Sequence, residues 1–268
     1  MEQLGRGHLA LRRVRALRRD PALRRAESVF LAEGLHLAVE ALACHAAIEE
    51  VFVSPRLTER PEGRALAAQI EKRRLPCRMT SDAILGSLQD ARSAQPILLL
   101  VRRPECSLRQ AVAGGDSKAL VTVACSVQDP GNLGAMIRST DAAGGTGFVV
   151  TGTGADLFHP RTVRASMGSI FRLPAVQADL DELISLLHAE GIVSLGTDPQ
   201  RGVPHFEADL CQRSAFLLGG EADGLPAGIR ERLDGVVRVA MRDGVNSLSV
   251  SAAAAVLLFE AARQRASA

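Results

Sequence analysis

Three short polar segments could do chemistry, and each directly follows an apolar run that is typical of a strand. The first, residues 128–141 (QDPGNLGAMIRSTD), combines the amide of Asn132 with the guanidinium of Arg138. Asn132 is placed to cap a helix, because its side chain can accept hydrogen bonds from free backbone N–H groups. Gly131 and Gly134 allow backbone or substrate to approach closely. Taken alone, an ordinary strand-to-helix turn with a surface arginine also explains this segment.

The other two segments place an acid and a serine cluster at strand ends. Residues 218–226 (LGGEADGLP) carry two glycines and Glu221, which would need several hydrogen bonds if it were buried. Residues 239–251 (VAMRDGVNSLSVS) form a hydroxyl-rich stretch that runs into an apolar C-terminal helix. A capped turn explains the first of these alone. A serine-capped core helix explains much of the second, but not its whole serine cluster.

A regular alternation of strands and helices is predicted to position these segments. The predicted strands are 119–125, 147–151, 192–197, 215–218 and 236–240, and the predicted helices are 132–143, 160–167, 179–190 and 248–264. Continuous apolar strands that alternate with helices indicate a parallel sheet covered on both faces. Ligands of such sheets bind outside the carboxyl ends of the strands. The three polar segments are therefore expected to meet at one edge of the sheet.

The N-terminal part of the chain predicts a smaller α/β unit. Residues 9–19 (LALRRVRALRR) predict an amphipathic helix with a basic face, ending near Asp20 and Pro21. The strands expected after it are 28–34, 48–54, 76–79 and 96–101, with helices at 35–46 and 61–73. The polar, turn-rich run that follows predicts a linker. The expected organisation is an α/β domain over 1–105, a linker over 106–118 and a second domain over 119–268.

Basic charge is concentrated at the start of the chain. The whole chain has a formal net charge of +2, whereas residues 1–25 carry eight arginines against two acids. A local basic arm can hold phosphate without a high overall charge, although a solvated helix face explains the same residues. The residues expected to contact nucleic-acid phosphate in this arm are Arg12, Arg13, Arg18 and Arg19.

The composition argues against several other classes of protein. No stretch approaches the roughly 20 apolar residues of a membrane span, and no apolar segment follows the N-terminal arginines as it does in a secretory signal. Five widely spaced cysteines without a C-x-x-C pair argue against disulfides and structural zinc, and the six histidines lack metal-ligand spacing. Residues 152–157 (GTGADL) lack the third glycine of a dinucleotide-binding loop, which argues against an oxidoreductase. We therefore expect a cytoplasmic protein without metal.

In their order along the chain, the three segments resemble the signature motifs of the SpoU/TrmH family, within the SPOUT superfamily of RNA methyltransferases. The positions that match are Asn132, Gly134 and Arg138 in the first motif, Gly219, Glu221 and Gly224 in the second, and Ser247, Leu248, Val250 and Ser251 in the third. Residues 164–174 resemble the stretch that connects these motifs. Residues 28–53 resemble the small RNA-binding domain that many members carry in front.

The resemblance implies a fold, a reaction and an assembly. The fold is an α/β one: a parallel-sheet SPOUT domain with a deep trefoil knot, preceded by a small RNA-binding domain. The reaction is ribose 2′-O-methylation of RNA with S-adenosylmethionine as methyl donor, and ribosomal RNA is favoured over transfer RNA by the basic arm and the front domain. The assembly is a homodimer with donor pockets at the subunit interface. The residues expected to line the donor pocket are Thr197, Gly220, Val239, Met241 and Leu248.

The resemblance also assigns roles in the reaction. Arg138 is expected to stabilise the emerging alkoxide and to hold the adjacent phosphate, because a guanidinium is a poor proton acceptor. The residues expected to orient the nucleotide and this arginine are Asn132, Glu221, Ser247 and Ser249. The sequence departs from the family at Ser249, where an asparagine is usual, and at Ala240, where a proline is usual. A non-catalytic RNA-binding protein that keeps the fold is therefore the alternative.

Overall fold

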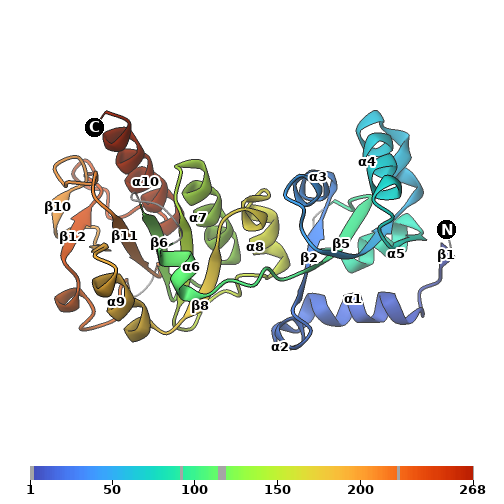
Figure 1. The fold of residues 1–268 in the computed structure, drawn as a ribbon, viewed down its shortest axis with the longest axis horizontal. Helices are drawn as coiled ribbons and strands as arrows, with labels where there is room; N and C mark the ends of the chain where they lie inside the picture. Colours follow the sequence, from blue (N-terminus) through green and yellow to red (C-terminus); the bar gives the residue numbers. More distant parts are fainter. Residues whose placement is uncertain (1–2, 91–92, 114–118, 222–223, 268) are drawn as a thin grey trace. The chain divides into compact units, whose positions relative to one another are not determined.

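The computed structural model describes residues 3–90, 93–113, 119–221 and 224–267 (Figure 1). The chain divides into two compact units. We call Met1–Glu105 together with Phe158–Phe171 the N-terminal unit, and Cys106–Leu157 together with Arg172–Ala268 the C-terminal unit. The N-terminal unit thus includes one segment, residues 158–171, that comes from the second half of the sequence.

The N-terminal unit is built on a five-stranded sheet in the order β1-β4-β3-β5-β2. Its strands are β1 (Gln3–Leu4), β2 (Val29–Glu33), β3 (Ile48–Val53), β4 (Cys77–Thr80) and β5 (Ile97–Arg102). Strand β5 runs antiparallel to both of its neighbours, whereas β4 is parallel to β3 and β1. The helices are α1 (Leu9–Arg19), α2 (Pro21–Ala26), α3 (Leu35–Ala43), α4 (Pro61–Lys72) and α5 (Asp82–Leu88), with a 3-10 turn η1 (Pro55–Glu59).

Helix α1 has the bounds predicted for the amphipathic helix. Its residues Leu11, Val14 and Leu17 are fully buried on one face and join the core formed by β2, β3 and β5. Helix α1 ends at Arg19, and a second helix, α2, begins directly after Asp20. The Asp20 carboxylate accepts hydrogen bonds from the N–H groups at the start of α2, and Pro21 occupies the first position of that second helix.

The segment taken from the C-terminal half contains α8 (Pro160–Ala165) and the 3-10 turn η2 (Ser169–Phe171). The rings of Phe158 and Phe171 pack on Phe30 of β2, with centroids 5.0 and 5.9 Å away. Arg164 of α8 pairs with the buried carboxylate of Glu33 at 3.3 Å. Aromatic packing and a charge pair therefore attach this segment to the N-terminal unit.

The C-terminal unit is built on a seven-stranded sheet in the order β10-β12-β9-β11-β6-β7-β8, and all of its strand pairs are parallel. Its strands are β6 (Leu120–Cys125), β7 (Gly147–Thr151), β8 (Ala175–Ala178), β9 (Val193–Thr197), β10 (Val203–Pro204), β11 (Ser214–Gly219) and β12 (Gly235–Arg238). Its helices are α6 (Leu108–Ala113), α7 (Pro130–Ala142), α9 (Leu180–Ala189) and α10 (Val250–Ala266), with a 3-10 turn η3 (Arg230–Arg232). The predicted parallel sheet is confirmed.

Helices cover both faces of this sheet (Figure 1). Helices α6 and α9 share a buried cluster with Val121 and Val123 of β6. The side chain of Thr122 points to the opposite face, because side chains alternate along a strand. There Thr140 of α7 donates to the Thr122 hydroxyl at 2.8 Å, and α7 packs against α10.

Several short elements were not predicted from the sequence. The range 106–118, expected to be a linker, contains α6, whose Ala111 and Val112 are fully buried. Residues 114–118 of that range lie outside the described residues. Helix α5 and strand β8 were also not predicted, although strands as short as β4 and β12 were.

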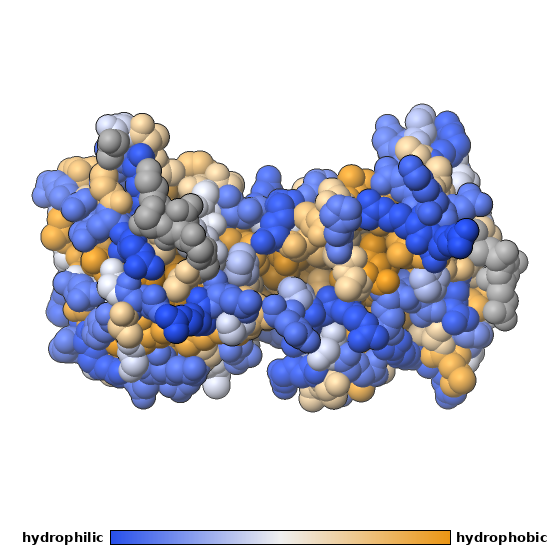
Figure 2. Space-filling view, viewed as in Figure 1, coloured by the Kyte–Doolittle hydropathy of each residue, from blue (hydrophilic) through white to orange (hydrophobic). Residues whose placement is uncertain are grey.

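The surface shows hydrophilic residues over much of the face of each unit seen in Figure 2, with smaller apolar patches between them. None of the helices in the described ranges combines the length and the apolarity that crossing a bilayer requires.

Candidate active site

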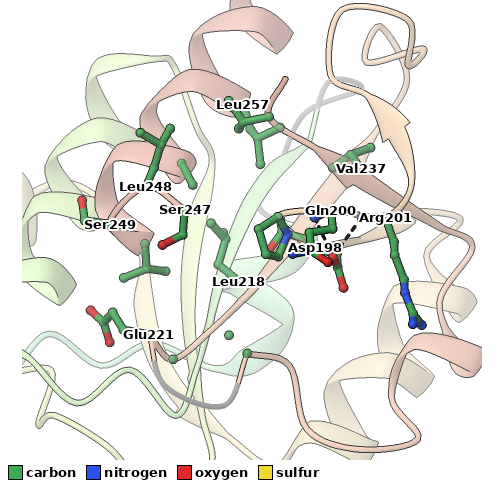
Figure 3. A pocket seen from close by; sticks show the side chains of 18 of the residues that line it. Asp198, Gln200, Arg201, Leu218, Glu221, Val237, Ser247, Leu248, Ser249 and Leu257 are labelled. Atoms are coloured by element: carbon green, nitrogen blue, oxygen red, sulfur yellow. Dashed lines mark hydrogen bonds between the residues drawn. The ribbon is translucent and has the colours of Figure 1, made fainter. Parts of the chain in front are cut away.

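A cavity of about 670 Å³ lies in the C-terminal unit, where β9, β11 and β12 end (Figure 3). Its walls come from residues 197–201 after β9, from 218–221 and Gly224 after β11, and from residues between β12 and the first turns of α10. Its volume lies in the range of small-molecule sites, which is roughly 300–1,000 Å³. The sheet edge predicted to hold a ligand therefore does form a cavity.

Eight of the residues expected to act at the site line this cavity. They are the five donor-pocket positions Thr197, Gly220, Val239, Met241 and Leu248, together with Glu221, Ser247 and Ser249. Two expected site residues, Asn132 and Arg138, are not part of its lining.

Asn132 does not cap α7, contrary to the expectation from the sequence. The helix begins two residues earlier at Pro130, and its cap is Asp129, which accepts a hydrogen bond from the Asn132 N–H at 2.8 Å. The aspartate takes the cap because a proline in the first helical position already has the helical φ angle. The side-chain amide of Asn132 is consequently available for other contacts.

The amide of Asn132 joins the three polar segments. Its Nδ2 donates to Oε1 of Glu221, and its Oδ1 accepts from the Ser251 hydroxyl at 2.8 Å. Glu221 is exposed, so it does not need the several hydrogen bonds expected of a buried carboxylate. One amide therefore fixes the relative positions of a cavity-lining acid and the start of α10.

The serine cluster before α10 serves two purposes. Ser249 is the N-cap of α10 and accepts from the N–H of Ala252 at 3.2 Å. Ser251 contacts both the Ser249 hydroxyl, at 3.3 Å, and Asn132. Ser251 was not among the predicted site residues. Two signals pointed to it: its match to the third motif and a serine cluster larger than one cap requires.

Arg138 is exposed on α7, six residues and thus about 9 Å along the helix axis from Asn132. In the described part of the chain, no hydrogen bond or ion pair engages its guanidinium. The structure therefore brings Asn132, Glu221, Ser247 and Ser249 together and leaves Arg138 apart from them.

The loop after β9 adds charged groups that the sequence did not point to. The carboxylate of Asp198 accepts from the N–H groups of Gln200 and Arg201 at 2.8 and 2.9 Å, and pairs with Arg230 at 2.9 Å. Burial acts to raise the pKa of Asp198, but these backbone donors and Arg230 together lower it below its ordinary value. Asp198 is consequently a fixed negative charge that shapes one wall of the cavity.

Two glycines allow the loop after β11 to fold as it does. A Cβ atom on Gly219 would lie 1.9 Å from the carbonyl carbon of Gly224. A Cβ atom on Gly220 would lie 2.8 Å from the carbonyl oxygen of Ser126. Any side chain at Gly219 would therefore displace the backbone that walls the cavity.

The four arginines expected to bind RNA differ in their surroundings. Arg13 pairs with Glu27 and Glu49, each at 2.7 Å, and Arg18 donates to the carbonyl oxygens of Ser87 and Gln89. These two side chains stabilise the fold of the N-terminal unit. Arg12 and Arg19 are exposed on α1 and face solvent.

The described residues contain no cluster of three or more histidine, cysteine, aspartate or glutamate side chains that could hold a metal ion.

Comparison with known proteins places the chain among RNA methyltransferases. A model of the SpoU rRNA Methylase family matches residues 119–259, and a model of the MRM3-like substrate binding domain matches residues 10–98. The chain is 34% identical over 226 residues to the 23S rRNA (guanosine(2553)-2′-O)-methyltransferase RlmP of Bacillus subtilis, covering 84% of this chain and 85% of that protein. It is 34% identical over 219 residues to the 23S rRNA (guanosine-2′-O-)-methyltransferase RlmB of Xanthomonas axonopodis, covering 81% of this chain and 87% of that protein.

Solved structures agree with this relationship over the whole chain. One such structure is the SpoU methyltransferase AviRb of Streptomyces viridochromogenes in complex with the cofactor AdoMet. It superposes with a TM-score of 0.87 at 26% identity, and the match covers 97% of this chain and 100% of AviRb. An AdoMet-bound rRNA methyltransferase of Sinorhizobium meliloti superposes with a TM-score of 0.86 at 26% identity, covering 98% and 97%. The chain belongs to the SpoU rRNA methylase family.

Proposed function

We propose that the protein is an S-adenosylmethionine-dependent ribose 2′-O-methyltransferase that acts on ribosomal RNA in the cytoplasm. The observation that carries this proposal is the hydrogen-bonded set Glu221, Asn132 and Ser251, which joins all three polar segments beside one cavity. Ribosomal RNA as the substrate and the 2′ oxygen as the acceptor are supported by relatives that align with more than four-fifths of the chain and are named 23S rRNA 2′-O-methyltransferases.

The cavity fits the methyl donor. Leu218, Val237 and Leu257 provide apolar wall for an adenine ring, and polar groups stand at both ends. The residues that would hold the donor are Thr197, Gly220, Val239, Met241 and Leu248. When bound, S-adenosylmethionine supplies an electrophilic methyl group on its sulfonium.

The protein's own residues would prepare the ribose oxygen for this methyl group. The 2′-OH must lose its proton as the new C–O bond forms, and a phosphate oxygen or water takes that proton. Arg138 stabilises the negative charge that develops on the oxygen and holds the neighbouring phosphate. Asn132, Glu221 and the serines before α10 fix the nucleotide in attack geometry, which supplies a large share of the rate.

We further propose that the active protein is a homodimer formed through the C-terminal unit. Arg138 is exposed and does not line the cavity of its own chain. Phe259 of α10, the helix that packs against α7, is 52% exposed and would supply an apolar side chain to such an interface. In such a dimer, Arg138 of one protomer would complete the cavity of its partner.

Mixed dimers test this shared site. Arg138→Ala is expected to keep donor binding and abolish transfer, and Leu248→Arg to block the donor cavity. In an equal mixture, half of the dimers contain one copy of each variant, and each of these has one site with both an open cavity and Arg138. Mixing the two variants should therefore restore about a quarter of wild-type transfer. Mixed dimers that form but transfer nothing would contradict the shared site.

The deep trefoil knot that the resemblance implies is part of the same proposal. Its support is that three loops, which follow β9, β11 and β12, all wall one cavity at the same edge of the sheet. A crystal structure traced through residues 197–257 is expected to show the chain threaded through a loop of the sheet. An unthreaded trace would contradict it.

The substrate is tested by mapping 2′-O-methyl groups in total RNA from cells with and without the gene. We expect the loss of methylation at a site in ribosomal RNA, restored by the wild-type gene. A change confined to transfer RNA would contradict the proposed substrate.

A further inference from the structure

Arg230 stands in the cavity wall beside the last glycine of the second motif. Its Nη2 pairs with Asp198 at 2.9 Å, and a Cβ atom built on Gly224 would lie 3.8 Å from that same nitrogen. The guanidinium therefore sits between the loop after β9 and the loop after β11, which together form this part of the cavity.

Within the described ranges, one N–H of this guanidinium lacks an acceptor. The Nε of Arg230 is buried from solvent and has no hydrogen-bond partner among the described residues. Leaving a buried donor unpaired costs free energy, and this cost rises when the group is charged. Asp198 fixes the orientation of the guanidinium, and because the Arg230 side chain is 36% exposed in the cavity wall, its terminal N–H groups can still donate to a ligand in the cavity.

The polar groups of the cavity are divided between two sides (Figure 3). Glu221, Ser247 and Ser249 lie on one side, where Asn132 joins the acid to α10. Asp198 and Arg201 lie on the other, and the cations that line the cavity, Arg201 and Arg230, belong to this second side. A ligand with one anionic end would be oriented by this division.

The proposed methyl donor has one anionic group, the carboxylate of its amino-acid end. Resting on the proposed function, we infer that Arg230, held in place by Asp198, binds this carboxylate. A guanidinium is the preferred partner of a carboxylate because its planar N–H groups match the two oxygens. Held there, the amino-acid end would fix the position of the neighbouring sulfonium within the cavity.

The chain offers a matched control on the same turn. Arg232, two residues after Arg230, donates to Asp181 and does not line the cavity. Arg232→Gln removes the same charge from the same 3-10 turn without touching the proposed contact.

Two ligands that differ only at the amino-acid end test the assignment. S-adenosylhomocysteine carries the carboxylate, and 5′-methylthioadenosine keeps the adenosine and the sulfur but lacks the amino-acid end. Binding of both ligands is measured by calorimetry. Arg230→Gln is expected to weaken S-adenosylhomocysteine binding about tenfold and to change methylthioadenosine binding by less than about twofold. A tenfold loss corresponds to about 1.4 kcal/mol of binding free energy, which is within the range of a charged hydrogen bond. Arg232→Gln should bind both ligands like the wild type.

The remaining variants separate binding from folding. Arg230→Lys keeps the charge without the fork, so it should fall between wild type and Arg230→Gln, and it answers the question if Arg230→Gln does not fold. Asp198→Asn, which releases the guanidinium, should also weaken S-adenosylhomocysteine selectively.

Equal weakening of both ligands in Arg230→Gln would overturn the inference, because the arginine would then shape the adenosine site. A wild type that binds the two ligands equally would also overturn it. Methyl transfer to ribosomal RNA is measured on the same wild-type preparation, so that a failure of this contact is told apart from a failure of the proposed reaction.

Discussion

At the scale of single residues, the site depends on one amide. Asn132 donates to Glu221 and accepts from Ser251, a pairing that needs a donor and an acceptor on the same small side chain. The sequence pointed to Asn132 by the family motif but gave it the wrong local role, because it cannot show which of two neighbouring polar residues caps a helix. Asp198 and Arg230 carried no sequence signal at all, since their pairing depends on how two loops fold together.

Asn132→Asp tests the amide. The change keeps the shape but removes the Nδ2 donor and places a second negative charge beside Glu221. We expect methyl transfer to fall about a hundredfold, corresponding to about 2.7 kcal/mol in the barrier, with donor affinity little changed. Steady-state transfer rates and donor calorimetry measure the two effects.

Gln69→Glu is a matched control, because it makes the same amide-to-acid change at an exposed position of α4. It should transfer methyl groups like the wild type. An Asn132→Asp protein with wild-type turnover would show that the amide is not needed at the site.

At the scale of elements, most strands and helices were predicted, including short ones such as β4 and β12, whereas α5, α6 and β8 were not. Strand β7 has its predicted bounds, and β6 and α9 begin or end within one residue of the prediction, since their apolar patterns are continuous or strongly periodic. Helix α7 begins two residues earlier than predicted, because Asp129 and Pro130 together start it. The cavity itself depends on the backbone conformation of the loops, which the pattern of residue types does not specify.

Gly219→Ala tests the loop after β11. The new Cβ would lie 1.9 Å from the carbonyl carbon of Gly224, so the loop must move and the cavity wall with it. We expect donor affinity to fall by at least about tenfold, together with a lower midpoint of thermal unfolding. Gly7→Ala, where a Cβ atom meets nothing within 4 Å, is the control and should change neither. Unchanged donor binding in Gly219→Ala would count against this wall as part of the donor site.

The C-terminal half of α10 is held by a carboxylate whose titration can be followed. Arg263 and Gln264 donate to Glu260, and Gln264 in turn contacts the backbone of Ala208 and Leu210. The hydrogen bonds from Arg263 and Gln264 lower the pKa of Glu260 from 4.5 to about 2. A lowered folded-state pKa stabilises the fold fully above the unfolded value and loses this effect as pH falls.

We therefore expect Glu260→Gln to lower the midpoint temperature of unfolding at pH 7. The difference in midpoint between the variant and the wild type should shrink as the pH falls from 4.5 to about 2. Thermal unfolding followed by circular dichroism across this range measures it. A difference that is the same at pH 7 and near pH 2 would contradict the role of the ionised carboxylate.

At the scale of the whole molecule, chain order and spatial units do not coincide. Residues 158–171 lie inside the stretch that resembles the methyltransferase domain, yet they pack within the N-terminal unit. The sequence could not show this, because an aromatic residue such as Phe158 is equally suited to either core. Its packing on Phe30 depends on contacts between residues more than a hundred positions apart.

A fragment of residues 106–268 should consequently expose Phe158 and Phe171, which in the whole chain pack on Phe30. We expect this fragment to bind a hydrophobic dye and to aggregate, and the same fragment with both residues changed to serine to be more soluble. Soluble yield and dye fluorescence measure the effect. Equal behaviour of the two fragments would mean that the segment finds cover within the C-terminal unit.

The central claim is that the protein methylates the ribose 2′ oxygen of ribosomal RNA. The most direct measurement supplies purified protein with labelled S-adenosylmethionine and two ribosomal RNA fragments, identical except that one carries 2′-deoxyribose at the mapped nucleotide. Since the 2′ oxygen is the proposed acceptor, the ribose fragment should gain one methyl group and the deoxy fragment none. Equal labelling of both fragments, or none of either, would contradict the proposed reaction.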